Sequence, residues 1–413
     1  MSTGAMVLSP ARQLGPLYRA TYLFGVACGI SLALTPLSLG RSGFGKEDMG
    51  TLALFFAAGL VLFSLPVGAL LRRFGAKAIL IGALGGYAAC VAAFPHMKSY
   101  VSIAGIRFFD GAFSICVWVS SETVVLSRSD EKHKAHLTSL YAIWLASGYV
   151  TGPLLARGLA PWLSFEQLFS LAGFIACLAV IYLMRSLGTA HAGGSTSHAG
   201  PTTTQSTLSI LRKIKTSCFA SFSYGYFQAA VVLFLPLYLI ESKAIPADDT
   251  IVLPGLFCLG MLLCSNVAGR WGDRSGHLLV MGALSTVGMA CVFGFVFVDH
   301  YWLMCTLVFL AGGTLASMSP IALALTGVVV DPSDLGRANS LYNTFYASGI
   351  LLGPPISSLV FARYGGALML YHLAALWAAF IVFTIVFARD DPAAQGRRLS
   401  LRPRPLAVTP RDS

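Results

Sequence analysis

The sequence predicts an all-α integral membrane protein in which twelve transmembrane helices form two pseudo-symmetric six-helix bundles. Composition is the first observation behind this prediction: 56% of the 413 residues are hydrophobic, 11% are charged, and the mean hydropathy is +0.74. Because soluble domains carry about 25% charged residues, most of this chain is suited to lipid. The other two observations are a set of long apolar runs and an internal repeat.

The apolar runs are long enough to cross a bilayer, which takes ~20 residues of helix. They are continuous rather than alternating in polarity, which favours helices over membrane strands. Six runs lie in the first half, at about 18–39, 49–71, 78–95, 101–127, 137–157 and 167–185. Six more lie in the second half, at about 216–240, 251–270, 278–298, 302–330, 338–362 and 368–388.

The repeat has one fixed offset in two distant segments. Residues 139–153 match residues 340–354, with Ser-Leu-Tyr at the start and Gly-x-x-x-Gly-Pro at the end of both copies. Gly, Arg and Gly at positions 68, 73 and 75 recur at positions 269, 274 and 276. This agreement indicates a duplicated half. The expected organisation is a bundle at 1–185, a Ser-, Thr- and Gly-rich cytoplasmic linker at 186–215, a bundle at 216–388 and a disordered cytoplasmic tail at 389–413.

Lysine and arginine set the expected orientation, because cytoplasmic loops hold the excess of these residues. With the N-terminus inside, 21 of the 28 lie on the cytoplasmic side, six lie opposite, and Arg107 falls within a span. We therefore expect a multi-pass protein of the cell (inner) membrane with both termini in the cytoplasm. The net charge of +11 then reflects topology and attraction to anionic lipid, not nucleic-acid binding.

The sequence offers no cofactor or metal site. All nine cysteines lie in apolar spans and none forms a C-x-x-C pair, which is typical of small buried hydrophobes. A phosphate-binding G-x-x-x-x-G-K-[ST] loop is absent, so energy has to come from a gradient or a partner. An enzyme is disfavoured because no His, Ser or Cys cluster accompanies the buried acids.

Two turns between spans carry a recognisable pattern. The first has Gly68, Leu70, Arg73, Gly75 and Lys77, and the second has Gly269, Asp273, Arg274 and Gly276. Over about residues 18–388 the chain thus resembles the major facilitator superfamily of secondary transporters, whose two halves are parallel repeats and whose signature at this turn is G-x-L-A-D-R-x-G-R-K. The first copy departs from the signature, because Arg72 stands where the family has an aspartate.

A further family element in the fifth span, G-x-x-x-G-P, is matched by Gly148, Gly152 and Pro153, with Gly349, Gly353 and Pro354 as its second-half copy. This element resembles the drug:proton antiporter-like branch, so the resemblance favours export. Helix packing is the alternative, because small residues four apart let membrane helices approach closely.

The buried charges gather in the span at 101–127, which holds Arg107, Asp110 and Glu122. Each costs about 2.5 to 3.5 kcal/mol at a helix centre and needs a partner or a wet cavity. Asp110 lies about 14 Å deep if the helix enters near Val101, and Arg107 shares its face. Either the two only neutralise each other, or Asp110 exchanges a proton while Arg107 tunes it or binds an anionic substrate.

Nearer the cytoplasmic end of that span, Glu122 is expected to pair with Arg72 or Arg73. The pair would form a cytoplasmic gate together with Asp273 and Arg274 of the second copy. The resemblance supports this geometry, since the family often has an acid in the fourth helix facing the first signature. Here Glu122 would compensate for the aspartate that Arg72 replaces.

Polar and aromatic side chains at helical spacing are candidates for a substrate cavity, although such stripes are also common in packing. They are Tyr141, Trp144, Tyr224, Gln228, Asn339, Tyr342, Asn343 and Tyr346.

Taken with the resemblance, the sequence predicts a monomeric secondary transporter that moves a small molecule across the lipid bilayer by alternating access, with protons as the coupling ion and efflux as the direction. The alternatives are an organic-anion uptake permease and a membrane scaffold or receptor that kept the fold without transport. The sequence names no substrate.

Overall fold

Twelve long helical spans make up the fold of the computed structural model, which describes residues 10–64, 66–127, 134–186, 206–331 and 334–388. Eleven of these spans are long and apolar enough to cross a bilayer. The twelfth is α6, which packs along α1 inside the first bundle. All regular structure in the described ranges is helical, as the composition and the apolar runs predict.

The first bundle consists of α1 (Pro10–Arg41), α2 (Lys46–Ser64) with its continuation α3 (Pro66–Phe74), α4 (Ala76–Ala93), α5 (Tyr100–Ser127), α6 (Lys134–Leu159) and α7 (Phe165–Ser186). The second consists of α8 (Thr207–Lys243), α10 (Leu253–Ser275), α11 (His277–Phe295), α12 (Tyr301–Ala311) with the π-helix η2 (Gly312–Ala316) and α13 (Met318–Val329), α14 (Leu335–Tyr364) and α15 (Gly366–Val386). Two short elements, η1 (Phe94–His96) and α9 (Ala247–Thr250), lie in turns.

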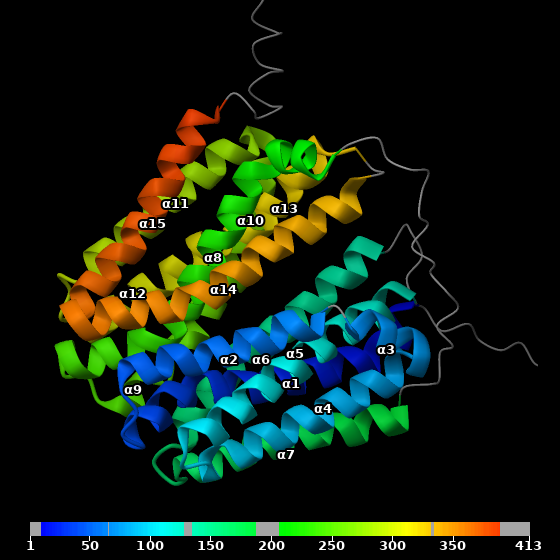
Figure 1. The fold of residues 1–413 in the computed structure, drawn as a ribbon, viewed down its shortest axis with the longest axis vertical. Helices are drawn as coiled ribbons and strands as arrows, with labels where there is room; N and C mark the ends of the chain where they lie inside the picture. Colours follow the sequence, from blue (N-terminus) through cyan, green and yellow to red (C-terminus); the bar gives the residue numbers. More distant parts are fainter. Residues whose placement is uncertain (1–9, 65, 128–133, 187–205, 332–333, 389–413) are drawn as a thin grey trace, which may run out of the picture.

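Figure 1 shows the two bundles side by side, with α1 to α7 in one and α8 to α15 in the other. We call the end at which α7 ends and α8 begins the linker end, and the end with the α1–α2 and α8–α10 turns the far end. The bundles meet at the far end, on the left of Figure 1, and diverge toward the linker end.

Close helix contacts repeat in the two bundles at the sequence offset. A Cβ atom at Gly59 of α2 would strike the carbonyl of Phe108, and one at Gly260 of α10 would strike the carbonyl of Phe309. Helix backbones touch at both places, as small residues allow in membrane bundles. The duplication read from the sequence therefore recurs as duplicated packing.

Helix ends differ from the expected span limits where polar residues continue a helix past its apolar stretch. The helix α8 begins at Thr207 rather than near 216, because the Ser206 side chain accepts a hydrogen bond from the backbone N–H of Ser209 and caps it. The expected span at 49–71 divides into α2 and α3, and α3 starts at Pro66, which lacks the N–H that a continuous helix needs. Most of the expected linker and the whole tail lie outside the described residues.

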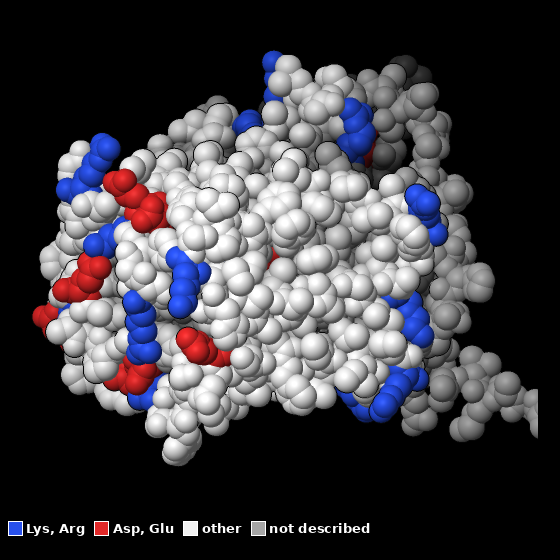
Figure 2. Space-filling model, turned by 60° about the horizontal axis from the view of Figure 1, so that its bottom comes forward, with Lys and Arg blue, Asp and Glu red and all other residues white. Residues whose placement is uncertain are grey.

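Charge is distributed unequally along the helices. On the face drawn in Figure 2, acidic and basic side chains mix at the far end, uncharged residues form a broad band, and Lys and Arg prevail at the linker end. The mixed end includes the ion pair Lys243–Asp299, with 2.6 Å between Nζ and Oδ1. An uncharged band between two charged ends is the surface that a bilayer requires.

Candidate functional site: a cavity between the two bundles

A cavity of about 310 Å³ lies between the two bundles. Its lining comes from α1, α2, α4, α5 and α6 on one side and from α8, α10 and α14 on the other. The charged side chains in that lining are Arg107 and Asp110. A volume of this size falls within the ~300–1,000 Å³ range of small-molecule sites.

Arg107 and Asp110 form an ion pair one helical turn apart on α5. The Nη1 and Oδ2 atoms are 2.5 Å apart, and the two side chains are 12% and 8% exposed. The Arg107 guanidinium also lies over the Phe56 ring, 4.4 Å from its centroid, while Ser114 Oγ donates to Asp110 Oδ1 at 3.5 Å. Each charge thus has a partner inside the membrane, as its cost there requires.

The pair belongs to a polar stripe on one face of α5. Arg107, Asp110, Ser114 and Trp118 follow each other at intervals of three or four residues, so they share a face of the helix, and all four line the cavity. The Nε1 atom of Trp118 is buried and has no hydrogen-bond partner in the described part of the chain. This wall therefore contains one unused donor.

The opposite wall is aromatic and uncharged. The rings of Tyr224 on α8 and Tyr346 on α14 stack with centroids 5.8 Å apart and planes at 24°. The Tyr346 hydroxyl donates to Oε1 of Gln228 at 2.9 Å, and the Tyr224 hydroxyl faces Met261 Sδ at 3.7 Å. Tyr224 and Gln228 are four residues apart on α8 and share a face, so these side chains form one continuous plate.

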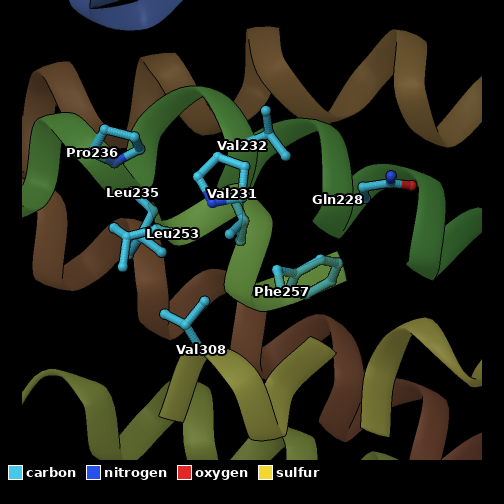
Figure 3. A pocket seen from close by; sticks show the side chains of 9 residues that line it. Gln228, Val231, Val232, Leu235, Pro236, Leu253, Phe257 and Val308 are labelled. Atoms are coloured by element: carbon cyan, nitrogen blue, oxygen red, sulfur yellow. The ribbon is translucent and has the colours of Figure 1, made fainter. Parts of the chain in front are cut away.

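An apolar cluster lies beside this plate, where the second bundle has no counterpart of the ion pair. Figure 3 shows Val231, Leu235 and Val308 grouped together, with the Gln228 amide pointing away from them. Position 308 is the repeat of position 107, and Val308 is 4% exposed. The residues that line the cavity from the second bundle carry no charge.

Contacts between the bundles close the cavity at the far end. Lys46 Nζ lies 2.7 Å from Glu241 Oε2, and Arg157 Nη2 lies 2.6 Å from Asp249 Oδ1. Each pair joins one bundle to the other. In addition, a Cβ at Gly50 of α2 would meet the Ser358 side chain of α14. The bundles are thus held together at the far end and diverge toward the linker end (Figure 1).

Three of the residues expected in the cavity, Tyr224, Gln228 and Tyr346, line it. Tyr141 and Tyr342 lie inside their bundles at 5% exposure, and the Tyr342 hydroxyl is 2.9 Å from Ser319 Oγ.

The other three expected residues lie outside this lining. Trp144 is 38% exposed and meets Tyr22 edge to face. Asn339 and Asn343 are exposed on α14, where Nδ2 of Asn343 donates to Oδ1 of Asn339 at 3.1 Å. This hydrogen bond partly satisfies the two amides.

Sequence reasoning missed Trp118 and Tyr149, which line the cavity from α5 and α6. A signal existed for Trp118, because it continues the three- and four-residue spacing from Asp110. For Tyr149 no such signal existed. Its place in the lining depends on how closely α6 packs on α1.

The expected gate residues lie at the linker end of the helices. Glu122 on α5 and Arg73 and Arg274 are exposed, and the Arg73 guanidinium stacks over the Phe74 ring at 5.2 Å. Among the described side chains no ion pair joins Glu122 to Arg73. The side chains of Arg72 and Asp273 lie outside the described residues, so the gate stays a prediction.

The Gly-x-x-x-Gly-Pro elements lie at close helix crossings. A Cβ at Gly148 would meet the carbonyl of Tyr22 on α1, and one at Gly152 would meet that of Val26. In the second bundle Gly349 and Gly353 of α14 touch α8 in the same way, at Phe222 and Tyr226. These contacts show that the four glycines allow close helix packing.

Two repeated six-helix bundles around a central cavity are the architecture of secondary transporters built from parallel repeats. The family model of the Major Facilitator Superfamily matches residues 17–246 and again residues 217–411. The chain belongs to this superfamily, and it is a transporter rather than an enzyme.

Bacterial relatives extend over nearly the whole chain. An uncharacterised MFS-type transporter of Yersinia enterocolitica is 22% identical over 368 residues, which are 88% of this chain and 92% of that protein. One of Enterobacter sp. strain 638 is 22% identical over 385 residues, or 90% and 94%. These relatives are consistent with a protein of the inner membrane.

Solved structures share the fold at low identity. A mutant of the nucleoside transporter NupG superposes with a TM-score of 0.76 at 12% identity, covering 91% of this chain and 99% of that one. A bacterial homologue of the human lysosomal transporter Spinster, in an inward-facing and occupied conformation, gives 0.70 at 13% identity, with coverage of 95% and 98%. The human organic anion transporter TETRAN gives 0.62 at 13% identity, with coverage of 91% and 99%.

Proposed function

We propose that this transporter exports a small molecule in exchange for protons and that its linker end faces the cytoplasm. The observation that carries the proposal is the buried ion pair of Arg107 and Asp110 in the cavity wall. Ionisable residues at this depth commonly belong to proton or substrate pathways. Asp110 holds a proton in the state in which Arg107 has moved away, because a lone carboxylate is costly there.

Alternating access supplies the movement. The contacts at the far end belong to a state that opens toward the linker end, which is the cytoplasm in this proposal. In the opposite state Lys46 and Arg157 separate from their partners, while Glu122 meets Arg72 or Arg73 and closes the linker end. In the first-half part of this gate one acid, Glu122, faces two cations, so closure is sensitive to the charge of Glu122.

Export is favoured over uptake by the Gly-x-x-x-Gly-Pro element, which resembles that of the drug:proton antiporter-like branch. Uptake of an organic anion is the second candidate, with Arg107 as the counter-charge. The geometry disfavours it because Asp110 already neutralises Arg107, and an anion would have to displace a carboxylate 2.5 Å away.

Replacing Asp110 tests the coupling. Ligands are first identified by thermal stabilisation of the purified protein across a compound library, and their transport is then measured in proteoliposomes. Asp110→Asn should abolish accumulation driven by a proton gradient and spare counterflow, because binding and rocking need no net proton movement. The control is Asp299→Asn at an exposed far-end position.

Gradient-driven accumulation by Asp110→Asn at the wild-type rate would place the coupling site elsewhere. If the wild-type protein shows no counterflow, the membrane-scaffold alternative is favoured.

The orientation has its own test. Single cysteines at Ser197 and Ser242, in a cysteine-depleted chain, are labelled in intact cells with an impermeant maleimide. Ser242 lies at the far end and is exposed, so it should react, and Ser197 should not. The reverse labelling pattern would show that the membrane topology is the opposite of the one proposed.

A further inference from the structure

A second hollow, separate from the central cavity, lies where the two bundles meet at the far end. It has a volume of about 790 Å³ and shares no lining residue with the central cavity. Its lining comes from α6 of the first bundle and from the segment 249–256 and α12 of the second. Trp302 in this lining is 72% exposed and Thr306 is also exposed, so the hollow opens toward lipid. We call it the outer groove.

The polar end of the outer groove is the ion pair of Arg157 and Asp249. These side chains are 39% and 33% exposed, so both remain accessible to a further partner. Arg157 Nη2 donates to Asp249 Oδ1 at 2.6 Å, but a guanidinium has five N–H donors and a carboxylate has about four acceptor sites. The Tyr301 hydroxyl donates to the backbone carbonyl of Asp249 at 2.8 Å and leaves the carboxylate unused. The groove therefore presents a cation and an anion side by side.

The rest of the outer groove is mainly apolar. Val252, Leu256 and Phe309 contribute to its lining, and the eight residues from Tyr301 to Phe309 carry it ~12 Å along α12. Trp302 lies at the far-end start of α12, and tryptophan is enriched at membrane surfaces. The groove thus has charges at the membrane surface and apolar side chains deeper in the bilayer, which is the arrangement that an amphiphile requires.

Selectivity in this groove has to come from the headgroup of the amphiphile. Every lipid of the bilayer offers an acyl chain, and these chains are as apolar as leucine, so the apolar part favours no lipid over another. A phosphate accepts hydrogen bonds from Arg157, and an ammonium with N–H groups donates to Asp249. A lipid with a net negative charge lacks the second contact and brings its charge near the Asp249 carboxylate.

We infer that the outer groove binds a phospholipid with an ethanolamine headgroup from the leaflet at the far end. The phosphate contacts Arg157, the ammonium contacts Asp249, and one acyl chain lies along Leu256 and Phe309. Because Arg157 belongs to the first bundle and Asp249 to the second, the headgroup adds a bridge between the bundles. The site is distinct from the central cavity and does not depend on the direction of transport.

Three phospholipids with identical acyl chains test the headgroup. They are phosphatidylethanolamine; phosphatidylcholine, which has the same charges but no N–H on its nitrogen; and phosphatidylglycerol, which has the phosphate but no ammonium. The purified full-length protein is mixed with equimolar amounts of the three in detergent, and the retained lipids are measured by native mass spectrometry. Phosphatidylethanolamine should be retained about fivefold better than phosphatidylcholine, the effect of one hydrogen bond, and phosphatidylglycerol no better than phosphatidylcholine.

Variants of the ion pair test the two headgroup contacts separately. Asp249→Ala should remove the preference for phosphatidylethanolamine and raise retention of phosphatidylglycerol, because Arg157 then meets the phosphate without an opposing acid. Arg157→Ala should lower retention of all three lipids, since all carry the phosphate. The control is Lys46→Ala, which breaks another ion pair between the bundles outside the groove lining. It should keep the lipid preference.

A variant in the apolar part locates the acyl chain. Thr306→Phe places a ring in the outer groove and should lower retention of all three lipids. Thr286→Phe on α11 is the matched control. Thr306 and Thr286 are both exposed and each donates to the carbonyl four residues earlier, but Thr286 lies outside the groove lining. Thr286→Phe should leave retention unchanged.

The other outcomes overturn the inference. Equal retention of phosphatidylethanolamine and phosphatidylcholine by the wild-type protein would mean that it holds unselected annular lipid only. Strongest retention of phosphatidylglycerol would mean that the site selects negative charge. A preference that persists unchanged in Asp249→Ala, or retention that persists in Thr306→Phe, would place the lipid elsewhere. If Asp249→Ala fails to fold, the wild-type lipid order and Thr306→Phe still decide.

Discussion

In the first bundle α5 presents Arg107 and Asp110 to the cavity, whereas the corresponding helix of the second bundle has Val308 and Ala311 at the repeated positions. Val308 and Ala311 are 4% and 6% exposed and pack among apolar neighbours. The difference is reversed on the next pair of helices. There the second bundle presents Tyr346, and the first has Leu145 at the repeated position.

Packing positions did not diverge in this way. Gly111 of α5 and Gly312 of η2 match at the offset of the repeat, and each meets a backbone carbonyl of the neighbouring helix, that of Phe56 or Phe257. A side chain at such a crossing would separate the helices, so both copies retain glycine. Positions that face the cavity carry no such restriction. Duplication therefore fixed the scaffold and left the two walls free to specialise, one in charge and one in aromatic surface.

The largest effect is expected when the ion pair of Arg107 and Asp110 in the cavity wall is disrupted. Arg107→Ala leaves Asp110 buried without its partner and should lower the free energy of unfolding by about 3–5 kcal/mol, seen as a lower melting temperature in detergent. Arg107→Val combined with Asp110→Ala copies the second bundle. This double variant should recover most of the stability and still lack proton-coupled transport.

A double variant as unstable as Arg107→Ala would contradict the view that the pair serves the site rather than the fold. Asp299→Ala at the far end is the control, since Asp299 is 86% exposed in its pair and its loss should leave the melting temperature within experimental error.

A smaller effect is expected from the shared scaffold. Gly148→Ala and Gly349→Ala each place a Cβ against the backbone of the neighbouring helix, and each should destabilise by about 1–3 kcal/mol. Similar losses in melting temperature would confirm that the two crossings are equivalent. Gly82→Ala in α4 is the matched control, because its Cβ would enter open space. A loss confined to one crossing would show that the bundles do not share this restriction.

The smallest effect is expected at the far end, where the bundles meet. Lys46 and Arg157 are 25% and 39% exposed, so each ion pair contributes about 0.2–1 kcal/mol. Lys46→Ala with Arg157→Ala removes up to about 2 kcal/mol and should shift the population toward the state open at the far end by up to about thirtyfold. Labelling of Thr35→Cys, a cavity position on α1, by an impermeant maleimide in cells measures this shift. Lys243→Ala breaks a pair within one bundle and should leave the labelling unchanged; an equal rise would contradict the assignment.

Local patterns were enough for some of the site. Arg107 and Asp110 are three residues apart in an apolar run, so their pairing follows from helical geometry alone. The spacing that joins Tyr224 to Gln228 also lies on one helix. By contrast, Tyr346 reaches Gln228 from another helix, over 118 positions of sequence. Contacts of this kind depend on how helices are rotated against each other, which periodicity does not define.

Hydropathy, the offset of the repeat and helical spacing are properties of neighbouring residues or of alignment within the chain. The sequence was therefore enough to predict the lipid environment, the number of spans, the duplication and the buried charges. The tertiary structure alone decided which side chains share the cavity. Trp118 lines it, whereas Trp144, equally aromatic and also within a span, lies beside Tyr22 outside the lining. The physical reason is that the glycine crossings set the rotation and tilt of each helix, and these angles select the few residues that face the space between the bundles.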